Sequence, residues 1–233
     1  MYQLGIKMKK WDELPEFMRN DSVKKYYDIL VKHEKELRVK RWLDIALSII
    51  LLIVLSPIML IVSIAIKLDS PGPVIFRQVR VTQYGKKFYI LKFRTMVENA
   101  EKMGTQVTIS KDARLTKVGR VIRGCRIDEF PQLINVLRGE MSFVGARPEV
   151  VKYVRGYTEE MRATLLLPAG ITSRASICYK DEGEILENVE DIDDVYLHQV
   201  LPEKMSYNLE DLRKYSLRQD IMTMFMTIFA VLR

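Results

Sequence analysis

The chain has 233 residues, enough for one modest catalytic domain and a short membrane element. Its 37 lysines and arginines exceed its 30 aspartates and glutamates, and the formal net charge of +7 favours a polyanionic partner such as phosphate, anionic lipid or nucleic acid. Two cysteines and two widely separated histidines argue against a disulfide framework and a histidine-based metal site, and they favour a reducing compartment.

Residues 1–40 form a charged N-terminal extension that Pro15 interrupts. A helical run around Val23–Leu37 carries the aromatic residues Tyr26 and Tyr27 among its charges. We expect a solvated or interfacial helix here, which leads into the next segment of the chain.

The segment from Ile45 to Ile66 contains no charged residue and is dense in isoleucine, leucine and valine. A helix of about twenty such residues spans the ~30 Å hydrocarbon core of a bilayer. The segment begins too far from the N-terminus for a signal peptide, and no small-residue cleavage site follows it. Residues 41–68 are therefore predicted to form a membrane helix.

Whether this helix crosses the bilayer depends on Ser56 and Pro57, which lie near its middle. Pro57 cannot donate to the carbonyl of Ile53 and should kink the helix, while the Ser56 hydroxyl can bind a freed carbonyl. Basic residues flank both ends of the segment, so the positive-inside rule favours export of neither end. We predict a re-entrant helix, broken at Ser56-Pro57, that returns to the cytoplasmic face. A kinked single crossing is the alternative.

Residues 69–233 are predicted to form a cytosolic domain, and the whole chain is expected to be α+β and predominantly helical. A turn rich in proline and glycine ends the membrane helix, and Val74–Arg80 and Lys87–Phe93 have the pattern of a β-hairpin. A polar helix is expected at Val97–Met103. The apolar, methionine-rich run within Ser216–Arg233 is short for a membrane span, so we expect a core-packing or interfacial helix.

The end of the predicted hairpin carries two cations, Lys92 and Arg94. The alternation of a strand places both side chains on one face, where they could meet an anion. A solvated strand edge explains this isolated pattern equally well.

Two adjacent carboxylates, Asp128 and Glu129, precede a predicted helix that runs from Pro131 to about Leu137 and is stopped by Gly139. A helix N-terminus favours phosphate. With arginines close in sequence, one carboxylate could ligate Mg²⁺ and the other, ionised at pH 7, could attack phosphorus. The alternative is that the pair only caps the helix and pairs with arginines.

The loop that follows contains Gly145, Arg147 and Pro148. Glycine permits an unusual backbone turn, and the arginine fork suits phosphate. An ordinary surface loop is the alternative for this stretch.

Taken in order, these clusters resemble the bacterial sugar transferases known as monotopic polyprenyl-phosphate phosphoglycosyl transferases. The resemblance runs from about Lys40 to the C-terminus. The matching residues are Ser56-Pro57, Ser70-Pro71-Gly72-Pro73-Val74, Phe76-Arg77-Gln78, Lys92-Phe93-Arg94-Thr95-Met96, Asp112-Ala113-Arg114-Leu115-Thr116, Gly119-Arg120, Arg123, Asp128-Glu129-Phe130-Pro131-Gln132-Leu133, Asn135-Val136-Leu137, Ser142-Phe143-Val144-Gly145 and Arg147-Pro148. Each motif is short, but their ordered coincidence is specific.

The resemblance implies a mechanism in which Asp128 is the nucleophile. It would take the phosphosugar from a UDP-sugar, release UMP and form a covalent phosphosugar-aspartate, while Glu129 would bind Mg²⁺. Undecaprenyl phosphate would then attack this intermediate. The resemblance also implies that seven further residues bind substrate: Lys92, Arg94, Arg123, Arg126, Gln132, Arg147 and Pro148.

The resemblance further implies the cytoplasmic face of the bacterial inner membrane, in a polysaccharide or glycoconjugate pathway. Downstream glycosyltransferases and a second copy of the chain are further candidate partners, whereas nucleic acid is not expected. Two departures concern the substrate pocket. Ala146 stands where the family usually has proline, and Ser173-Arg174 replaces the usual Gly-Trp after Pro168–Thr172.

Two other functions are open on the sequence. A nucleotide-sugar hydrolase would keep the covalent step but let water accept the phosphosugar. A membrane-anchored scaffold would have no activity, although a surface that only attracts phosphate gains nothing from the adjacent Asp128 and Glu129.

Overall fold

The computed structural model describes residues 8–98, 100, 112–179, 189 and 191–232. It confirms a predominantly helical α+β chain with one long apolar helix and two small sheets. Its helices of eight or more residues are α1 (Asp21–Lys32), α2 (Glu34–Asp69), α3 (Lys117–Gly124), α9 (Leu201–Arg213) and α10 (Leu217–Leu232). The shorter helices are α4 (Gln132–Arg138), α5 (Val151–Val154), α6 (Arg174–Cys178) and α8 (Ile192–Val195). The 3₁₀ helices are η1 (Trp11–Glu13), η2 (Glu16–Met18), η3 (Gln83–Gly85), η5 (Ile127–Glu129) and η6 (Met161–Leu166), and η7 (Tyr196–Val200) is a π-helix.

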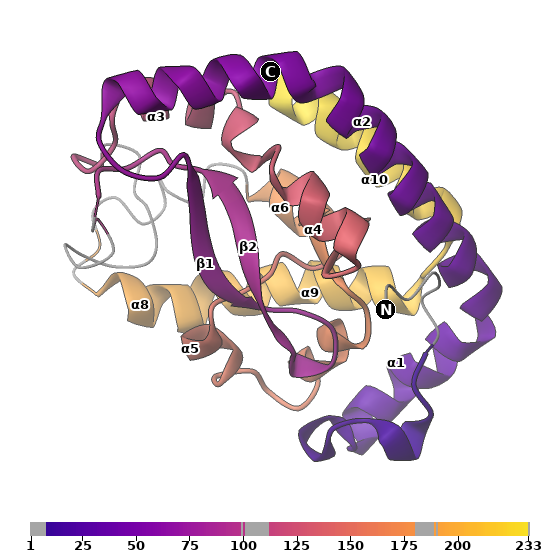
Figure 1. Ribbon diagram of the computed structural model, residues 1–233. Coiled ribbons are helices and arrows are strands. Elements are labelled where there is room, and N and C mark those ends of the chain that lie inside the picture. Colours follow the sequence, from indigo (N-terminus) through magenta and orange to yellow (C-terminus); the bar gives the residue numbers. More distant parts are fainter. Residues whose placement is uncertain (1–7, 99, 101–111, 180–188, 190, 233) are drawn as a thin grey trace.

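Helix α2 is 36 residues long and arches over one side of the molecule, from α1 to the start of the first strand (Figure 1). Helical structure continues through Ser56 and Pro57, and the predicted re-entrant bend at these residues stays a prediction. Proline removes the amide that would bind the Ile53 carbonyl. The Ser56 hydroxyl donates to that same carbonyl at 2.8 Å, so the carbonyl remains satisfied and the helix persists.

The two halves of α2 have different surroundings. Its first half packs on the rest of the chain through the buried polar residues Lys40, Arg41, Asp44 and Ser48. The following apolar stretch is largely exposed, and only 11% of its most apolar 18-residue window is buried. Within the described ranges, α2 alone has the length and composition to cross a membrane.

Helix α1 corrects the expectation of a solvated helix. Its side chains Val23, Tyr26, Tyr27 and Leu30 are buried in the largest hydrophobic cluster, which also contains residues of α9 and η6. The spacing of these four residues places them on one helical face. The N-terminal helix therefore packs as part of the same core as the C-terminal half of the chain.

The predicted hairpin is confirmed as the antiparallel strands β1 (Ile75–Val81) and β2 (Lys87–Phe93), joined by η3. A second sheet, not predicted, pairs β3 (Met141–Val144) with β4 (Ala169–Thr172) in parallel. Just past β3, the backbone of Gly145 lies so close to Gly170 that a Cβ on Gly170 would come within 2.2 Å of it. The segment that leads to Arg147 is thus held against β4 by a contact that only glycine permits.

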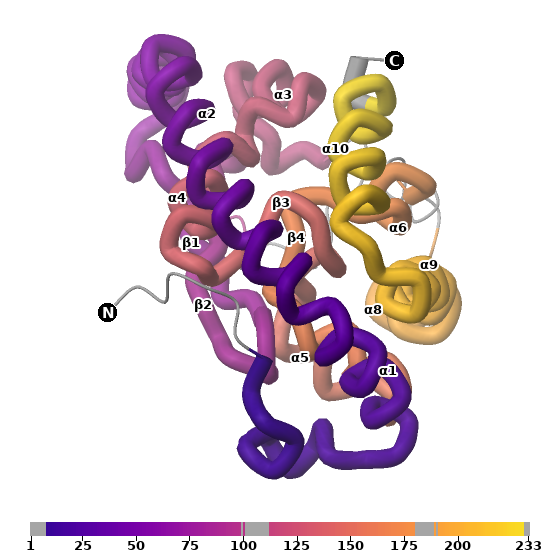
Figure 2. Tube along the Cα trace, turned by 90° about the vertical axis from the view of Figure 1, so that its right-hand side faces the viewer, coloured from indigo at the N-terminus to yellow at the C-terminus, as the bar shows by residue number. Residues whose placement is uncertain are grey.

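The C-terminal helix α10 contacts α2 and overlaps it in Figure 1, while Figure 2 shows that the two helices diverge over most of their length. It also contacts β3 and β4, and it exposes Met222, Phe225, Ile228 and Phe229. The expectation of a packing or interfacial helix agrees with this arrangement. The helix expected at Val97–Met103 falls largely outside the described residues.

Candidate active site

The two predicted catalytic carboxylates lie in η5, a single turn between α3 and α4. The turn is entered through Arg126, whose backbone has φ of 55°, an unusual left-handed conformation for a side chain of this size. Pro131 is the N-cap residue directly before α4, and Gly139 ends that helix with φ of 79°, as predicted. This tight entry and the fixed helix behind it hold Asp128 and Glu129 at the junction.

Glu129 is the centre of an ion-pair cluster. Its Oε1 atom accepts from Lys92 Nζ at 2.9 Å and from Arg147 Nη2 at 3.0 Å, so β2, η5 and the loop after β3 meet at one carboxylate oxygen. Burial alone would raise the pKa of the Glu129 carboxyl, but the charges of Lys92 and Arg147 outweigh burial and hold the pKa well below its usual range. Glu129 is therefore ionised at neutral pH.

Asp128 is buried, with 6% of its surface exposed. Burial raises its pKa above the ordinary value for aspartate, and the neighbouring charge of Glu129 raises it further, while Lys92 and Arg123 oppose the shift. A carboxylate that is poorly solvated, yet surrounded by cations, is a more reactive nucleophile than one in water. Burial likewise lowers the pKa of Lys92, against the opposing charge of Glu129.

The structure brings together Asp128, Glu129, Lys92 and Arg147, and it places Arg123 in the last turn of α3, close enough to influence Asp128. The Arg94 side chain is directed toward the end of α2 and has no hydrogen bond to the carboxylate pair. Its guanidinium donates to carbonyl groups at the end of α2.

Three other predicted substrate-binding residues border the cluster. Arg126 forms the entry to η5, Gln132 begins α4 and is 1% exposed, and the Pro148 carbonyl accepts from Arg80 at 3.2 Å. The side-chain nitrogen of Gln132 has no hydrogen-bond partner within the described part of the chain. Ser56 and Pro57, predicted at the membrane kink, lie in the exposed stretch of α2.

Two further residues support the cluster, and sequence reasoning gave neither of them a role. Asn135 is fully buried in α4, where its Oδ1 accepts from the Leu91 amide at 3.0 Å and its Nδ2 donates to the Tyr89 carbonyl at 2.9 Å. It therefore fixes β2, and so Lys92, to the helix after the carboxylates. A polar residue on the apolar face of α4 was the available signal.

The second missed residue is Glu149, directly after Arg147-Pro148. Its buried carboxylate accepts from the Tyr196 hydroxyl at 2.7 Å and lies 3.8 Å from Lys204 of α9. The Arg147 loop is thus attached to the C-terminal half of the chain. An acidic residue between the loop and the apolar Val150-Val151 was the signal that it is buried.

The carboxylate pair suits a metal that arrives with its substrate. No group of three or more histidine, cysteine, aspartate or glutamate side chains placed to hold a metal occurs among the described residues. Mg²⁺ usually keeps several waters and binds through one or two carboxylates together with substrate phosphates. Asp128 and Glu129 fit such a site better than a metal site made by protein ligands alone.

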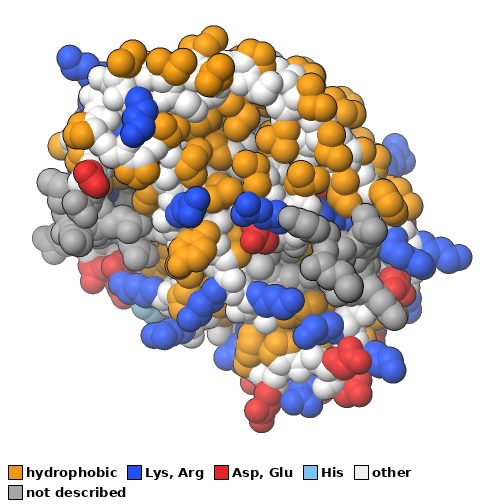
Figure 3. Space-filling view, viewed as in Figure 1, with side chains coloured by type: hydrophobic (Ala, Val, Ile, Leu, Met, Phe, Trp, Pro, Cys, Tyr) orange, Lys and Arg blue, Asp and Glu red, His pale blue; other side chains and the backbone are white. Residues whose placement is uncertain are grey.

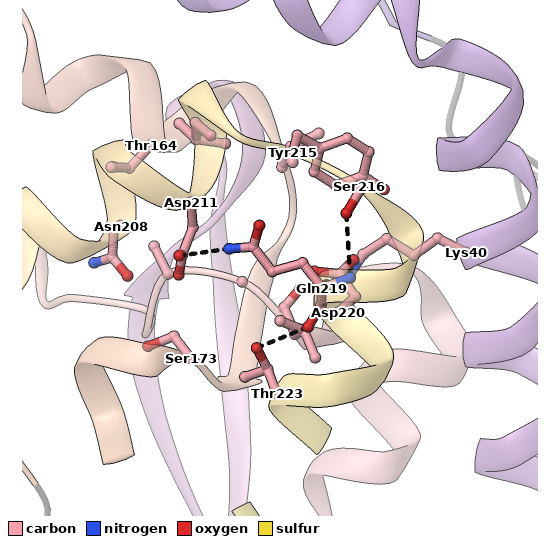
Figure 4. Close-up of a pocket in the computed structure, with 15 residues that line it drawn as sticks. Lys40, Thr164, Ser173, Asn208, Asp211, Tyr215, Ser216, Gln219, Asp220 and Thr223 are labelled. Atoms are coloured by element: carbon pink, nitrogen blue, oxygen red, sulfur yellow. Dashed lines mark hydrogen bonds and ion pairs between the residues drawn. The ribbon is translucent and has the colours of Figure 1, made fainter. Parts of the chain in front are cut away.

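A separate cavity of about 40 Å³ lies between α9, α10 and the loop after β3 (Figure 4). Polar side chains such as Lys40, Asp211 and Asp220 line it, and none of the predicted catalytic or substrate-binding residues does. A volume of this size holds a few water molecules and excludes a nucleotide.

Apolar and charged side chains occupy different parts of the surface around these elements. Figure 3 shows apolar side chains gathered over the arch of α2, with lysines, arginines and acidic residues concentrated below it. The exposed apolar residues of the arch include Ile50, Ile53, Leu60, Ile61 and Ile64. An apolar patch of this extent on a protein surface marks an interaction with a membrane or another protein.

Comparison with known proteins identifies the family to which this chain is similar. The model of the family described as bacterial sugar transferase matches residues 35–233. The chain is 36% identical, over 83% of its length, to a UDP-N-acetylgalactosamine-undecaprenyl-phosphate N-acetylgalactosaminephosphotransferase of Aeromonas hydrophila. It is 38% identical, over 82% of its length, to a UDP-glucose:undecaprenyl-phosphate glucose-1-phosphate transferase of Escherichia coli K12, and 38% identical over 84% to an undecaprenyl-phosphate glucose phosphotransferase of Komagataeibacter xylinus.

These relatives are longer proteins. The match covers 44% of the Aeromonas protein, 39% of the Escherichia protein and 36% of the Komagataeibacter protein. The match to the family model, by contrast, includes α2, both sheets, the carboxylate pair and α10. The chain therefore belongs to the bacterial sugar transferase family.

Proposed function

We propose that this protein transfers a sugar-1-phosphate from a UDP-sugar to undecaprenyl phosphate at the cytoplasmic face of a bacterial inner membrane. The observation that carries the proposal is the arrangement at η5. Lys92 and Arg147 both bind Glu129, and Asp128 lies buried beside them. The names of the relatives supply the two substrate classes.

In the first step, a carboxylate oxygen of Asp128 attacks the phosphorus that bears the sugar. A phosphorus–oxygen bond to Asp128 forms, the bond to the UMP oxygen breaks, and UMP leaves with the electron pair. In the second step, a phosphate oxygen of undecaprenyl phosphate attacks the same phosphorus. The bond to Asp128 breaks, which regenerates the carboxylate and gives undecaprenyl-diphospho-sugar.

Charge neutralisation is the chief contribution of the surrounding residues. Lys92 and Arg147 are held near Asp128 by Glu129, so they are in place to meet the phosphate oxygens as charge develops. We assign Glu129 as the protein ligand of Mg²⁺, which would neutralise the diphosphate of the donor when bound. Lys92 and Arg147 would then exchange part of their contact with Glu129 for contact with phosphate.

We further propose that α2 anchors the protein as a re-entrant element. Near its start, Lys40 Nζ donates to the Val144 carbonyl at 2.8 Å and to Asp220 at 2.5 Å. At its end, the Ser70 carbonyl accepts from Arg94 at 2.7 Å. Both ends of the helix thus contact the same folded body, which supports a return to one face of the membrane. Cysteine labelling at both ends of α2 in intact cells tests this, and an externally labelled end would exclude re-entry.

Trapping the intermediate tests the reaction itself. Purified protein is mixed with each member of a panel of UDP-sugars and Mg²⁺, quenched during turnover and examined by mass spectrometry of its peptides. We expect a sugar-phosphate mass on the peptide containing Asp128 and a lipid-dependent turnover. Steady-state UMP release at the same rate with and without undecaprenyl phosphate would indicate a hydrolase. The absence of an adduct would refute the covalent route.

A further inference from the structure

Arg94 lies where the long helix ends, and its side chain is 5% exposed. Its Nη1 atom donates to the Pro71 carbonyl at 2.7 Å, and its Nη2 atom donates to the Ser70 carbonyl at 2.7 Å and the Ser70 hydroxyl at 2.9 Å. A third carbonyl, that of Ile66 in the last turn of α2, lies 3.4 Å from Nη2. The guanidinium therefore binds the turn that directly follows α2, and it reaches one carbonyl of the last helical turn, that of Ile66, which also accepts from the Ser70 amide at 3.2 Å.

The chemistry of this contact is specific to arginine. A cation is favoured at the negative end of the helix dipole, and the planar fork reaches several carbonyls at once, which a lysine ammonium does less well. Gly72 leaves the space for the fork. Its φ is +112°, and a Cβ there would lie 2.2 Å from Arg94 Nη1.

A second contact ties the same turn to α3. Asp69, the last residue of α2, accepts from the Val118 amide at 2.9 Å in the first turn of α3. The Thr95 carbonyl, next to Arg94, accepts from the Thr116 amide at 3.0 Å. The end of α2 is thus fastened both to β2, which carries Lys92, and to α3, which leads to η5.

We propose that Arg94 is a positioning residue that fixes the far end of the membrane helix to the catalytic residues, and that it does not bind substrate phosphate. This rests on the proposed function. Undecaprenyl phosphate is held in the bilayer by its chain, so its phosphate can reach Asp128 only at a set height. The contact of Arg94 with the end of α2 sets that height.

The two steps of the reaction depend on this contact to different degrees. Lys92 is held without Arg94, because Asn135 binds β2 through its contacts with the Leu91 amide and the Tyr89 carbonyl. The step with the water-soluble UDP-sugar therefore does not require the contact. The step with the lipid does.

The test separates the steps in full-length protein reconstituted in lipid vesicles. Formation of the adduct is followed as a burst of UMP without undecaprenyl phosphate, and its decay is followed after this lipid is added. The variants are Arg94→Lys, which removes the fork, and Gly72→Ala, which displaces the fork but keeps the arginine. Arg77→Lys is the matched control, because Arg77 is exposed on β1 and has no part in the turn.

We expect Arg94→Lys and Gly72→Ala to leave the burst within about twofold of wild type and to slow the lipid step by about tenfold or more, as a misplacement of about 1 Å can. Arg77→Lys should change neither. A slower burst with a raised KM for the UDP-sugar would identify Arg94 as a phosphate ligand and overturn the proposal.

An unchanged lipid step would also overturn it, as would an equal loss in both steps accompanied by a lower Tm, which would indicate a purely structural role. Failure of the proposed function is distinguishable from all of these outcomes. In that case the wild-type protein itself would show no UMP burst and no sugar-phosphate mass on Asp128.

Discussion

At the scale of single residues, the site depends on the contrast between two neighbouring carboxylates. Glu129 is held ionised by two cations that contact one of its oxygens, whereas Asp128 is buried with a raised pKa. Adjacent groups pushed in opposite directions can take different roles in one reaction. The predicted division into metal ligand and nucleophile is consistent with this contrast.

The pKa of Asp128 leads to a pH dependence. The nucleophile must be ionised, so kcat/KM should be full above the raised pKa and fall as pH drops through it. We expect the acid limb of the profile to lie above the ordinary aspartate value of 3.8. Because burial lowers the pKa of Lys92, we expect an alkaline limb below the usual lysine range. A profile flat down to pH ~4, close to the ordinary aspartate pKa, would contradict the burial of Asp128 as the controlling factor.

Replacing the nucleophile is a sharper test. Asp128→Asn keeps the size of the side chain but removes the attacking oxygen charge, so turnover should fall by on the order of 10⁴-fold or more, with no adduct in mass spectra. The Tm should change little, because a buried carboxylate with a raised pKa is not a stabilising charge. Full activity in the Asp128→Asn variant would require another nucleophile.

The metal assignment has its own test. Glu129→Gln removes the anionic ligand, so the Mg²⁺ concentration for half-maximal activity should rise by about tenfold or more. Asp28→Asn is a suitable control, since the Asp28 carboxylate pairs with Lys24 on the surface of α1. An unchanged metal titration in Glu129→Gln would count against a role as ligand.

At the scale of secondary-structure elements, α1 is the part whose sequence is most misleading. Its charged residues suggest a solvated helix, yet Tyr26 and Leu30 are almost fully buried against α9 and η6. The charges occupy one face and the apolar residues the other, and only a tertiary partner shows that the apolar face is covered. The division of the chain at residue 40 stays a prediction, although α1 shares its core with the rest.

Burial of α1 predicts a stability effect. Leu30→Ala should lower the free energy of unfolding by about 2–5 kcal/mol, because it leaves a cavity in the largest cluster. Val31→Ala, at the next position but 42% exposed, should change it by less than about 0.5 kcal/mol. Denaturant unfolding in detergent measures both. Equal effects would mean that α1 does not pack as described.

Helix α2 shows how two local signals act together. Pro57 removes the amide that would bind the Ile53 carbonyl, and the Ser56 hydroxyl satisfies that carbonyl, as the sequence predicts. The hairpin and α4 were predictable, because alternation, Pro131 and Gly139 are local signals. The parallel pairing of Met141 with Ala169 was not, since it depends on contacts between distant segments.

The predicted catalytic cluster also combines features that local sequence signals predict with features that depend on distant segments. The carboxylates and Arg147 were identifiable from motif order, while the turn of Arg94 toward α2 was not. Alternation predicts one strand face for Lys92 and Arg94, but β2 ends at Phe93, and Lys92 contacts Glu129 while Arg94 contacts the Ser70 carbonyl. Alternation states which face a side chain leaves from, and the surrounding elements decide what it reaches.

At the scale of the whole molecule, the apolar arch of α2 and the exposed side of α10 form apolar surface of the kind that contacts a membrane or another protein. We expect both to enter the lipid. Replacing Phe225 and Phe229 of α10 by serine should weaken binding to vesicles in a flotation assay while leaving the fold intact. Replacing the exposed Phe17, which is remote from these helices in sequence, is the control. Unchanged flotation would confine the membrane contact to α2.

The buried pair of Lys40 and Asp220 has a consequence for how the protein is made. Its two members are 180 positions apart, so the early helix remains without its ionic counterpart until the ribosome has passed Asp220. A nascent chain stopped before that residue would leave the buried Lys40 ammonium with the Val144 carbonyl and the charge of Asp44 but without its ion-pair partner, and breaking a buried pair costs about 3–5 kcal/mol. The ion pair that fixes α2 to the rest of the protein therefore forms only after the start of the C-terminal helix has been synthesised, and not as the apolar segment emerges.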